Sequence, residues 1–174
     1  AAPYKPVAES IDARYPLHLN TGRLRDQWHA MSRTGRVARL FAHADTPVLS
    51  MNARDFELRR LKAGDLVRVK SRRGEVVVVA EASDSVRPGQ CFLPMHWGAR
   101  FMGGLGVNAL TLPVFDAVSK QPELKHAAVQ VAKAELPWRM AALAVGDGAK
   151  MIDAVQPLLR ACDYAAAGLA GRNQ

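Results

Sequence analysis

Leu66-Val-Arg-Val-Lys-Ser-Arg-Arg-Gly-Glu-Val-Val-Val-Val-Ala80 is the stretch that most clearly indicates the class of fold. Apolar and polar residues alternate from Leu66 to Ser71, which is the period of a strand with one face in water. Arg72-Arg73-Gly74 then predicts a turn, with Gly74 at a position of positive φ. The four valines that follow indicate a strand buried on both faces. The stretch therefore predicts a β-hairpin in a barrel or sandwich core.

The segments on either side of this hairpin add short strands and few helices. A helix is expected to begin after Asn52 as N-cap, with Asp55 in the reciprocal capping position, and to end at Gly64. Another is expected over residues 151–162, kinked or split at Pro157. Short strands are predicted at Tyr15–Leu19, Val37–Phe41, Val48–Met51, Gln90–Met95 and Val129–Lys133. This pattern predicts a mostly β, barrel-like domain with α insertions.

Composition narrows the classes of function. The chain has 174 residues, of which 49% are hydrophobic, so it can bury a core. The net charge of +8 favours a polyanionic partner such as nucleic acid, an anionic membrane or a phosphorylated cofactor. The two cysteines are too few for a disulfide framework and have no partner at metal-ligand spacing. No apolar stretch reaches membrane-spanning length.

The chain also divides by composition. Residues 1–14 are expected to form an extended linker, because they are rich in proline and lack an apolar pattern. Residues 15–138 are expected to form the barrel domain. Residues 139–174 are predicted to be a C-terminal extension, the start of a further module.

A basic stretch, Leu19 to Gly35, follows the first predicted strand. Leu24, Trp28 and Met31 have the spacing i, i+4 and i+7, which predicts one apolar face of a helix. A helix that begins just after a glycine turn presents unpaired N–H groups that suit phosphate. The residues alone leave two interpretations open. The stretch either binds a nucleotide-like or pterin-like anion, or it is a solvated basic helix packed through its apolar face.

The sequence Asn20-Thr-Gly-Arg-Leu-Arg-Asp-Gln-Trp-His-Ala-Met-Ser-Arg-Thr-Gly35 resembles the opening signature of the C-terminal cofactor domain of molybdopterin oxidoreductases. Among these it is most similar to assimilatory nitrate reductases. Asn108-Ala-Leu-Thr111 and Gln121-Pro-Glu-Leu-Lys-His-Ala-Ala-Val129 fit the same family. The resemblance covers most of residues 15–138 and implies that the barrel is a double-psi β-barrel.

The resemblance also implies which residues contact a cofactor. These cofactor-binding residues are Thr21, Gly22, Arg23, Leu24, Arg25, Trp28, His29, Asn108 and Lys125. Without the resemblance, Asn108 is better explained as a cap or turn residue and Lys125 as a surface cation. Trp97 and Phe101 either face a substrate funnel or pack at the barrel rim. No catalytic residue and no metal ligand is expected in this chain.

The function that the resemblance implies is that of a C-terminal domain of a cytoplasmic, molybdenum-dependent nitrate reductase, which converts nitrate to nitrite. The cofactor would be molybdenum bis(molybdopterin guanine dinucleotide), and a 4Fe-4S cluster is expected only in the N-terminal part of the enzyme. The partners would be the N-terminal domains and an electron donor, without nucleic acid or membrane. The isolated domain is expected to be inactive.

Two alternatives remain open at this stage. The same domain occurs in formate dehydrogenases and other oxyanion reductases. A stand-alone double-psi barrel that binds a protein or a nucleic acid through its basic face is the alternative of another class.

Overall fold

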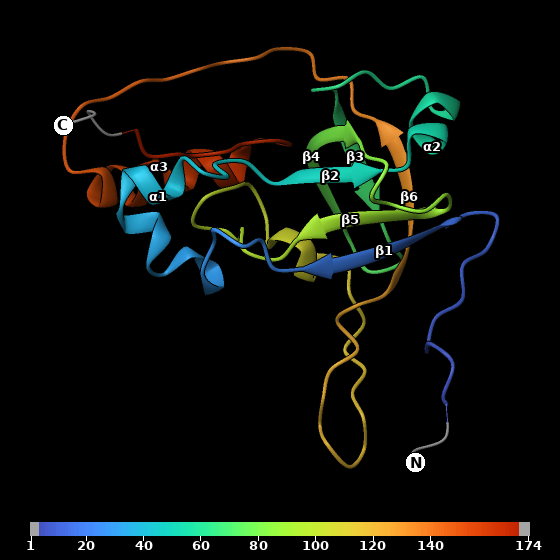
Figure 1. Cartoon of the computed structure of the whole chain (residues 1–174). Coiled ribbons are helices and arrows are strands. Elements are labelled where there is room, and N and C mark those ends of the chain that lie inside the picture. The colour runs from blue at the N-terminus through green and yellow to red at the C-terminus, as the bar shows by residue number, and fades with distance from the viewer. Residues whose placement is uncertain (1–3, 171–174) are drawn as a thin grey trace.

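The computed structural model describes residues 4–170, and its centre is a closed barrel of six strands (Figure 1). Around the barrel the strands follow the order β1-β5-β2-β4-β3-β6. The pairs β1–β5 and β2–β4 are parallel, and the other pairs are antiparallel. The strands are β1 (Leu17–Gly22), β2 (Val48–Met51), β3 (Leu66–Lys70), β4 (Glu75–Ala82), β5 (Gln90–Pro94) and β6 (Ala127–Lys133). The predicted double-psi β-barrel, mostly β with α insertions, is confirmed.

Short helices flank the barrel. In Figure 1 the helices α1 and α3 lie together on one side of it, and α2 lies on the other. The α-helices are α1 (Ala38–Phe41), α2 (Ala53–Leu58) and α3 (Gly148–Ala161), and the 3-10 helices are η1 (His29–Met31), η2 (Thr34–Arg36) and η3 (Gly106–Ala109). Within residues 4–170, none of these helices has the length and apolar character needed to cross a bilayer.

The β3–β4 hairpin forms as predicted. Leu66 pairs with Val79 and Lys70 with Glu75, and three of the four valines are buried. The prediction that Gly74 needs a positive φ is wrong. Glycine is required there for space instead, because a Cβ would lie 2.9 Å from the carbonyl oxygen of Ala109. The turn is thus shaped by Ala109, which lies about 35 residues further along the chain and is outside the reach of local turn rules.

The core fills the barrel and extends toward α1. Residues from every strand are buried in it, including Leu19, Leu49, Val67, Val78, Cys91, Leu93 and Val129. Beyond the strands, Phe41 packs on Phe101 with ring centroids 5.5 Å apart. Trp97 and Phe101 are both buried, so of the two interpretations the structure favours packing.

Two element predictions need correction in the first half of the chain. Residues 37–41 are not a strand: the N–H groups of Leu40 and Phe41 both bond to the Val37 carbonyl, at 3.0 Å, and helix α1 results. A short apolar run does not distinguish strand from helix by its period, which explains the error. Helix α2 ends at Leu58 rather than at Gly64.

Of the predictions for the caps of α2, one is confirmed and one is wrong, and the C-terminal helix α3 has an N-cap of its own. Asn52 caps α2 as predicted, because its Oδ1 accepts from Arg54 N at 3.1 Å. Asp55 does not complete a capping box, since its Oδ2 accepts from Gly89 N at 2.6 Å instead. The predicted C-terminal helix is present, and α3 runs without a break through Pro157. Its N-cap is Asp147, whose carboxylate accepts from two backbone N–H groups of the first turn.

Candidate functional site

The segment after β1 is not the helix that its apolar spacing predicts. After Gly22 the chain runs through turns to η1, where Ala30 and Met31 have φ of +46° and +51°. Met31 is buried, but Trp28 is 41% exposed, so the two do not share an apolar face. The predicted phosphate seat at a helix N-terminus after Gly22 is therefore also wrong.

A buried glutamine explains this irregular path. Gln27 is enclosed, and its Nε2 donates to the Ala44 carbonyl at 2.6 Å, while the Thr34 hydroxyl donates to its Oε1. Buried amide groups must find partners, and Gln27 finds them at Thr34 and at the end of α1 rather than within its own segment. Tertiary hydrogen bonds have overridden the helical period.

At the end of β1 the structure brings together residues from two of the motifs that carry the resemblance. Lys125 Nζ donates to the backbone carbonyl of Thr21 at 2.8 Å, across 104 residues of sequence. The Thr21 hydroxyl donates to the Leu124 carbonyl. Gly22 leaves room for Phe92, because a Cβ there would lie 2.9 Å from its ring, whereas Lys125 Nζ would be at an ordinary contact distance of 4.0 Å.

Beyond Gly22 the exposed groups form a second cluster of predicted residues. Arg23 Nη1 lies 3.3 Å from His29 Nε2. The His29 ring meets Trp28 edge-on, with centroids 5.2 Å apart. The guanidinium of Arg33 lies 4.6 Å from the Trp28 centroid. Cations and rings thus lie together on an exposed surface next to the end of β1.

Two further predicted residues have other contacts. Leu24 packs against the core, and its backbone N–H donates to His96 Nε2 at 2.9 Å. Arg25 is paired with the neighbouring Asp26 at 2.9 Å. Pairing with Arg25 also holds the pKa of Asp26 below its ordinary value.

Asn108 lies apart from these contacts. It is exposed in η3, and its carbonyl accepts from the Thr111 hydroxyl at 3.4 Å. Within the part of the chain that the structure describes, no hydrogen bond joins its side chain to the other predicted residues. Among the described residues, the Thr21–Lys125 contact therefore links two of the motifs, and the motif that contains Asn108 is not hydrogen-bonded to it through the Asn108 side chain.

His96 is a residue that sequence reasoning missed. It is 1% exposed, and its two ring nitrogens bond to the backbone of the segment after β1, at Leu24 and at Trp28. Burial is the main reason that its pKa lies below the ordinary value, and nearby His29 and Arg23 add to the effect. The only sequence signal is a polar residue placed directly after a buried strand.

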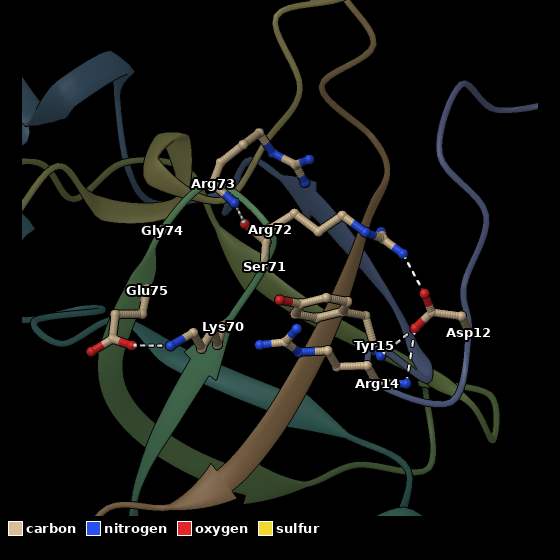
Figure 2. A pocket seen from close by; sticks show the side chains of 9 residues that line it. All are labelled: Asp12, Arg14, Tyr15, Lys70, Ser71, Arg72, Arg73, Gly74 and Glu75. Atoms are coloured by element: carbon tan, nitrogen blue, oxygen red, sulfur yellow. Dashed lines mark hydrogen bonds and ion pairs between the residues drawn. The ribbon is translucent and has the colours of Figure 1, made fainter.

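The hollow shown in Figure 2 lies elsewhere, at the turn of the β3–β4 hairpin. It has a volume of about 640 Å³ and is open to solvent. The guanidinium groups of Arg14 and Arg72 lie 5.6 and 4.7 Å from the centre of the Tyr15 ring. Arg72 is also bound by Asp12 and Glu9, so part of the positive charge in this hollow is already neutralised.

Metal-binding groups do not gather within residues 4–170: no cluster of three or more His, Cys, Asp or Glu side chains could hold an ion there. Cys91 and Cys162 are both free thiols. Burial raises the pKa of Cys91 to about 12, so this thiol stays protonated.

The chemistry of the donors at the end of β1 fits an anionic, oxygen-rich ligand. Lys125 has three N–H donors and uses one on Thr21, so two remain for a ligand. Arg23 offers a planar fork that suits phosphate or a pterin carbonyl. The indole N–H of Trp97, next to His96 in the chain, is buried and has no acceptor among the described residues. The site can thus supply both charge and hydrogen bonds to a bound anion.

Comparison with known proteins shows the family of the chain. Residues 17–128 match the family described as "Molydopterin dinucleotide binding domain". A curated relative, "Nitrate reductase" of Klebsiella oxytoca, is 43% identical over 135 residues, which are 78% of this chain and 16% of that protein. The chain thus spans about a sixth of that relative's length.

A solved structure supports the fold. "Acetylene Hydratase from Pelobacter acetylenicus" superimposes with a TM-score of 0.58 at 15% sequence identity, over 69% of this chain and 18% of that one. At this identity the likeness concerns the fold alone.

Proposed function

The chain belongs to the molybdopterin dinucleotide-binding family, and from this premise we propose that it grips the dinucleotide cofactor of a larger, molybdenum-dependent nitrate reductase. The cofactor proposed is molybdenum bis(molybdopterin guanine dinucleotide). The observation that carries the proposal is the contact of Lys125 with the Thr21 carbonyl, because it joins two family motifs into one donor surface.

In this proposal the chain's own residues bind and orient the cofactor. Lys125 directs its two remaining donors, and Arg23 its guanidinium, toward phosphate or pterin oxygens. His29, held 3.3 Å from Arg23, adds a ring nitrogen at the pterin edge. Gly22 keeps the backbone open to close approach. When bound, the cofactor supplies the oxygen-atom transfer that reduces nitrate to nitrite.

The rest of the activity belongs to the remainder of the protein. We assign the 4Fe-4S cluster, the metal ligand and the contact with an electron donor to the N-terminal domains, since this chain covers only 16% of the relative's length. The enzyme would act in nitrate assimilation in the cytoplasm, and the isolated domain would be inactive.

The test uses the natural full-length protein purified without air. Molybdenum and fluorescent pterin should both be present, and nitrate should reoxidise a reduced dye. Cofactor without nitrate turnover would redirect the proposal to a formate dehydrogenase or another oxyanion reductase. A folded protein that contains neither would overturn it, and strongly salt-dependent nucleic-acid binding would then favour the stand-alone barrel.

A variant pair tests the site itself. Arg23→Ala should lower molybdenum and pterin occupancy several-fold, while its exposed position predicts little effect on the free energy of unfolding. Arg54→Ala, an exposed arginine of α2 at the other end of the barrel, is the matched control and should retain full occupancy. Equal occupancy in the two variants would remove Arg23 from the cofactor site.

A further inference from the structure

His96 lies between two backbone groups of the segment that carries most of the proposed cofactor contacts. Its Nε2 lies 2.9 Å from Leu24 N, and its Nδ1 lies 2.9 Å from the Trp28 carbonyl oxygen. With 1% of its surface exposed, the ring has no room to exchange these partners for water. The side chain therefore bridges the segment across 72 and 68 residues of sequence.

The two partners assign the proton on the ring. Leu24 N is a donor, so Nε2 must be the bare, accepting nitrogen. The Trp28 carbonyl is an acceptor, so Nδ1 must carry the hydrogen. A neutral imidazole has one nitrogen of each kind, and only the Nδ1–H tautomer satisfies both bonds.

The bridged segment has little regular structure of its own. Between Gly22 and η1 it forms turns, and no helix or strand holds residues 23–28. The start of the segment is fixed by a hydrogen bond from Met95 N to the Gly22 carbonyl at 3.0 Å. His96 is the residue that follows Met95 in the sequence. Ordering an irregular segment costs conformational entropy, so a segment that forms a binding site must be held in place by other groups.

We propose that His96 is a positioning residue for cofactor binding, and that it holds Arg23 and His29 in place only as the neutral Nδ1–H tautomer. This inference rests on the proposed function. His96 does not touch the ligand in this proposal; it acts through the backbone of Leu24 and Trp28.

Protonation of His96 would break the bridge. A second N–H, on Nε2, would face the Leu24 N–H, and a buried donor would meet a donor. The ionisable groups near the ring are Arg23 and His29, and a positive charge on either opposes protonation of His96. Asp26, the carboxylate of the same segment, is paired with Arg25.

The sign of the pH dependence follows from this arrangement. Burial holds the pKa of His96 below its ordinary 6.5, so the bridge contributes fully above pH 6.5. Its contribution is lost as the pH falls through the pKa of the folded state. Cofactor retention should therefore weaken on the acid side of neutrality.

The experiment uses the full-length protein and two readouts. The first is amide hydrogen exchange of peptides that cover residues 22–29, read by mass spectrometry and corrected for the intrinsic effect of pH. The second is the pterin and molybdenum retained after gel filtration. Both are taken from pH 7.5 to 5.0 for the wild type, His96→Ala, His96→Gln and the exposed control Arg54→Ala.

The variants separate positioning from packing. In the wild type, protection of the segment and retained pterin should fall together as the pH drops from 6.5 to the lowered pKa of His96, by at most about tenfold for each pH unit, and should level off below that pKa. His96→Ala should be unprotected and poor in pterin at every pH. His96→Gln keeps an acceptor for Leu24 N but cannot titrate, so it should show intermediate, pH-independent values. Arg54→Ala should follow the wild type.

The results that overturn the inference differ from those that overturn the function. Wild-type protection of residues 22–29 in His96→Ala, or the wild-type pH profile in His96→Gln, would remove His96 from this role. Pterin absent from the wild type at pH 7.5 would overturn the proposed function and, with it, the link from His96 to a cofactor.

Discussion

Replacement of Glu9 by glutamine should destabilise the barrel in a pH-dependent way. Glu9 is 8% exposed, and its Oε1 accepts from Arg72 at 2.7 Å and from Arg73 at 2.8 Å. Its Oε2 accepts from Arg73 and from the backbone N–H of Ala128. The carboxylate thus ties residues N-terminal to the barrel to the β3–β4 turn and to β6. Glutamine keeps the shape but removes the charge.

The magnitude follows from the carboxylate's titration. Hydrogen bonds from Arg73, the largest cause, lower the pKa of Glu9 from 4.5 to about 2, against the effect of burial. A fall of this size corresponds to about 3 kcal/mol of linkage. Arg72 is 38% exposed, so solvent screening reduces its share. We therefore expect Glu9→Gln to lower the free energy of unfolding by about 2 kcal/mol at pH 7.

The assay is urea unfolding of the purified chain between pH 7 and pH 2. A lowered pKa contributes stability above the ordinary 4.5 and loses it as the pH falls through about 2. The difference in the free energy of unfolding between wild type and Glu9→Gln should therefore be constant above about pH 5.5 and should vanish toward pH 2. Asp12→Asn is the control, because Asp12 binds the same Arg72 but is 49% exposed, and its effect should be much smaller. Equal stability of Glu9→Gln and wild type at pH 7, or a stability difference that does not change with pH, would refute the reasoning.

Three further predictions concern the glycines and the core. Gly106→Ala should lower the free energy of unfolding by about 3 kcal/mol or more, because a Cβ at its φ of +65° would lie 2.0 Å from the Trp97 carbonyl oxygen. Gly64→Ala, where φ is +85° and the space is open, should lower it by about 1 kcal/mol. Gly22→Ala should cost about 1–2 kcal/mol in urea unfolding by displacing Phe92, and should also lower pterin occupancy of the full-length protein. The isolated chain should fold without metal, since its core is formed by apolar side chains; a collapsed, undispersed amide spectrum in the presence of a chelator would contradict this.

The predictions that succeeded from sequence rest on local patterns. The strands β2 to β6 lie where alternation or apolar runs predicted them, because a strand's two faces impose a period of two on its own residues. Asn52 as a helix cap is equally local, since its bond to Arg54 N spans two residues. The family resemblance is local in the same sense, as each of its motifs is continuous in sequence.

The predictions that failed for the segment after β1 and for Gly74 depended on distant neighbours. Leu24, Trp28 and Met31 have helical spacing, yet buried Gln27 and the bridging His96 hold the backbone in turns. Gly74 has room for no side chain because Ala109 lies against it.

The sequence by itself therefore determined the barrel class, most of its strands and the motifs that mark the family. Only the tertiary structure decided that Lys125 meets Thr21, that Asn108 lies apart from this contact, and that His96 bridges the segment after β1. The physical reason is the closure of the barrel. It pairs β1 with β5 and β6, and so brings together groups separated by 70 to 100 residues, roughly, whose meeting no local pattern encodes.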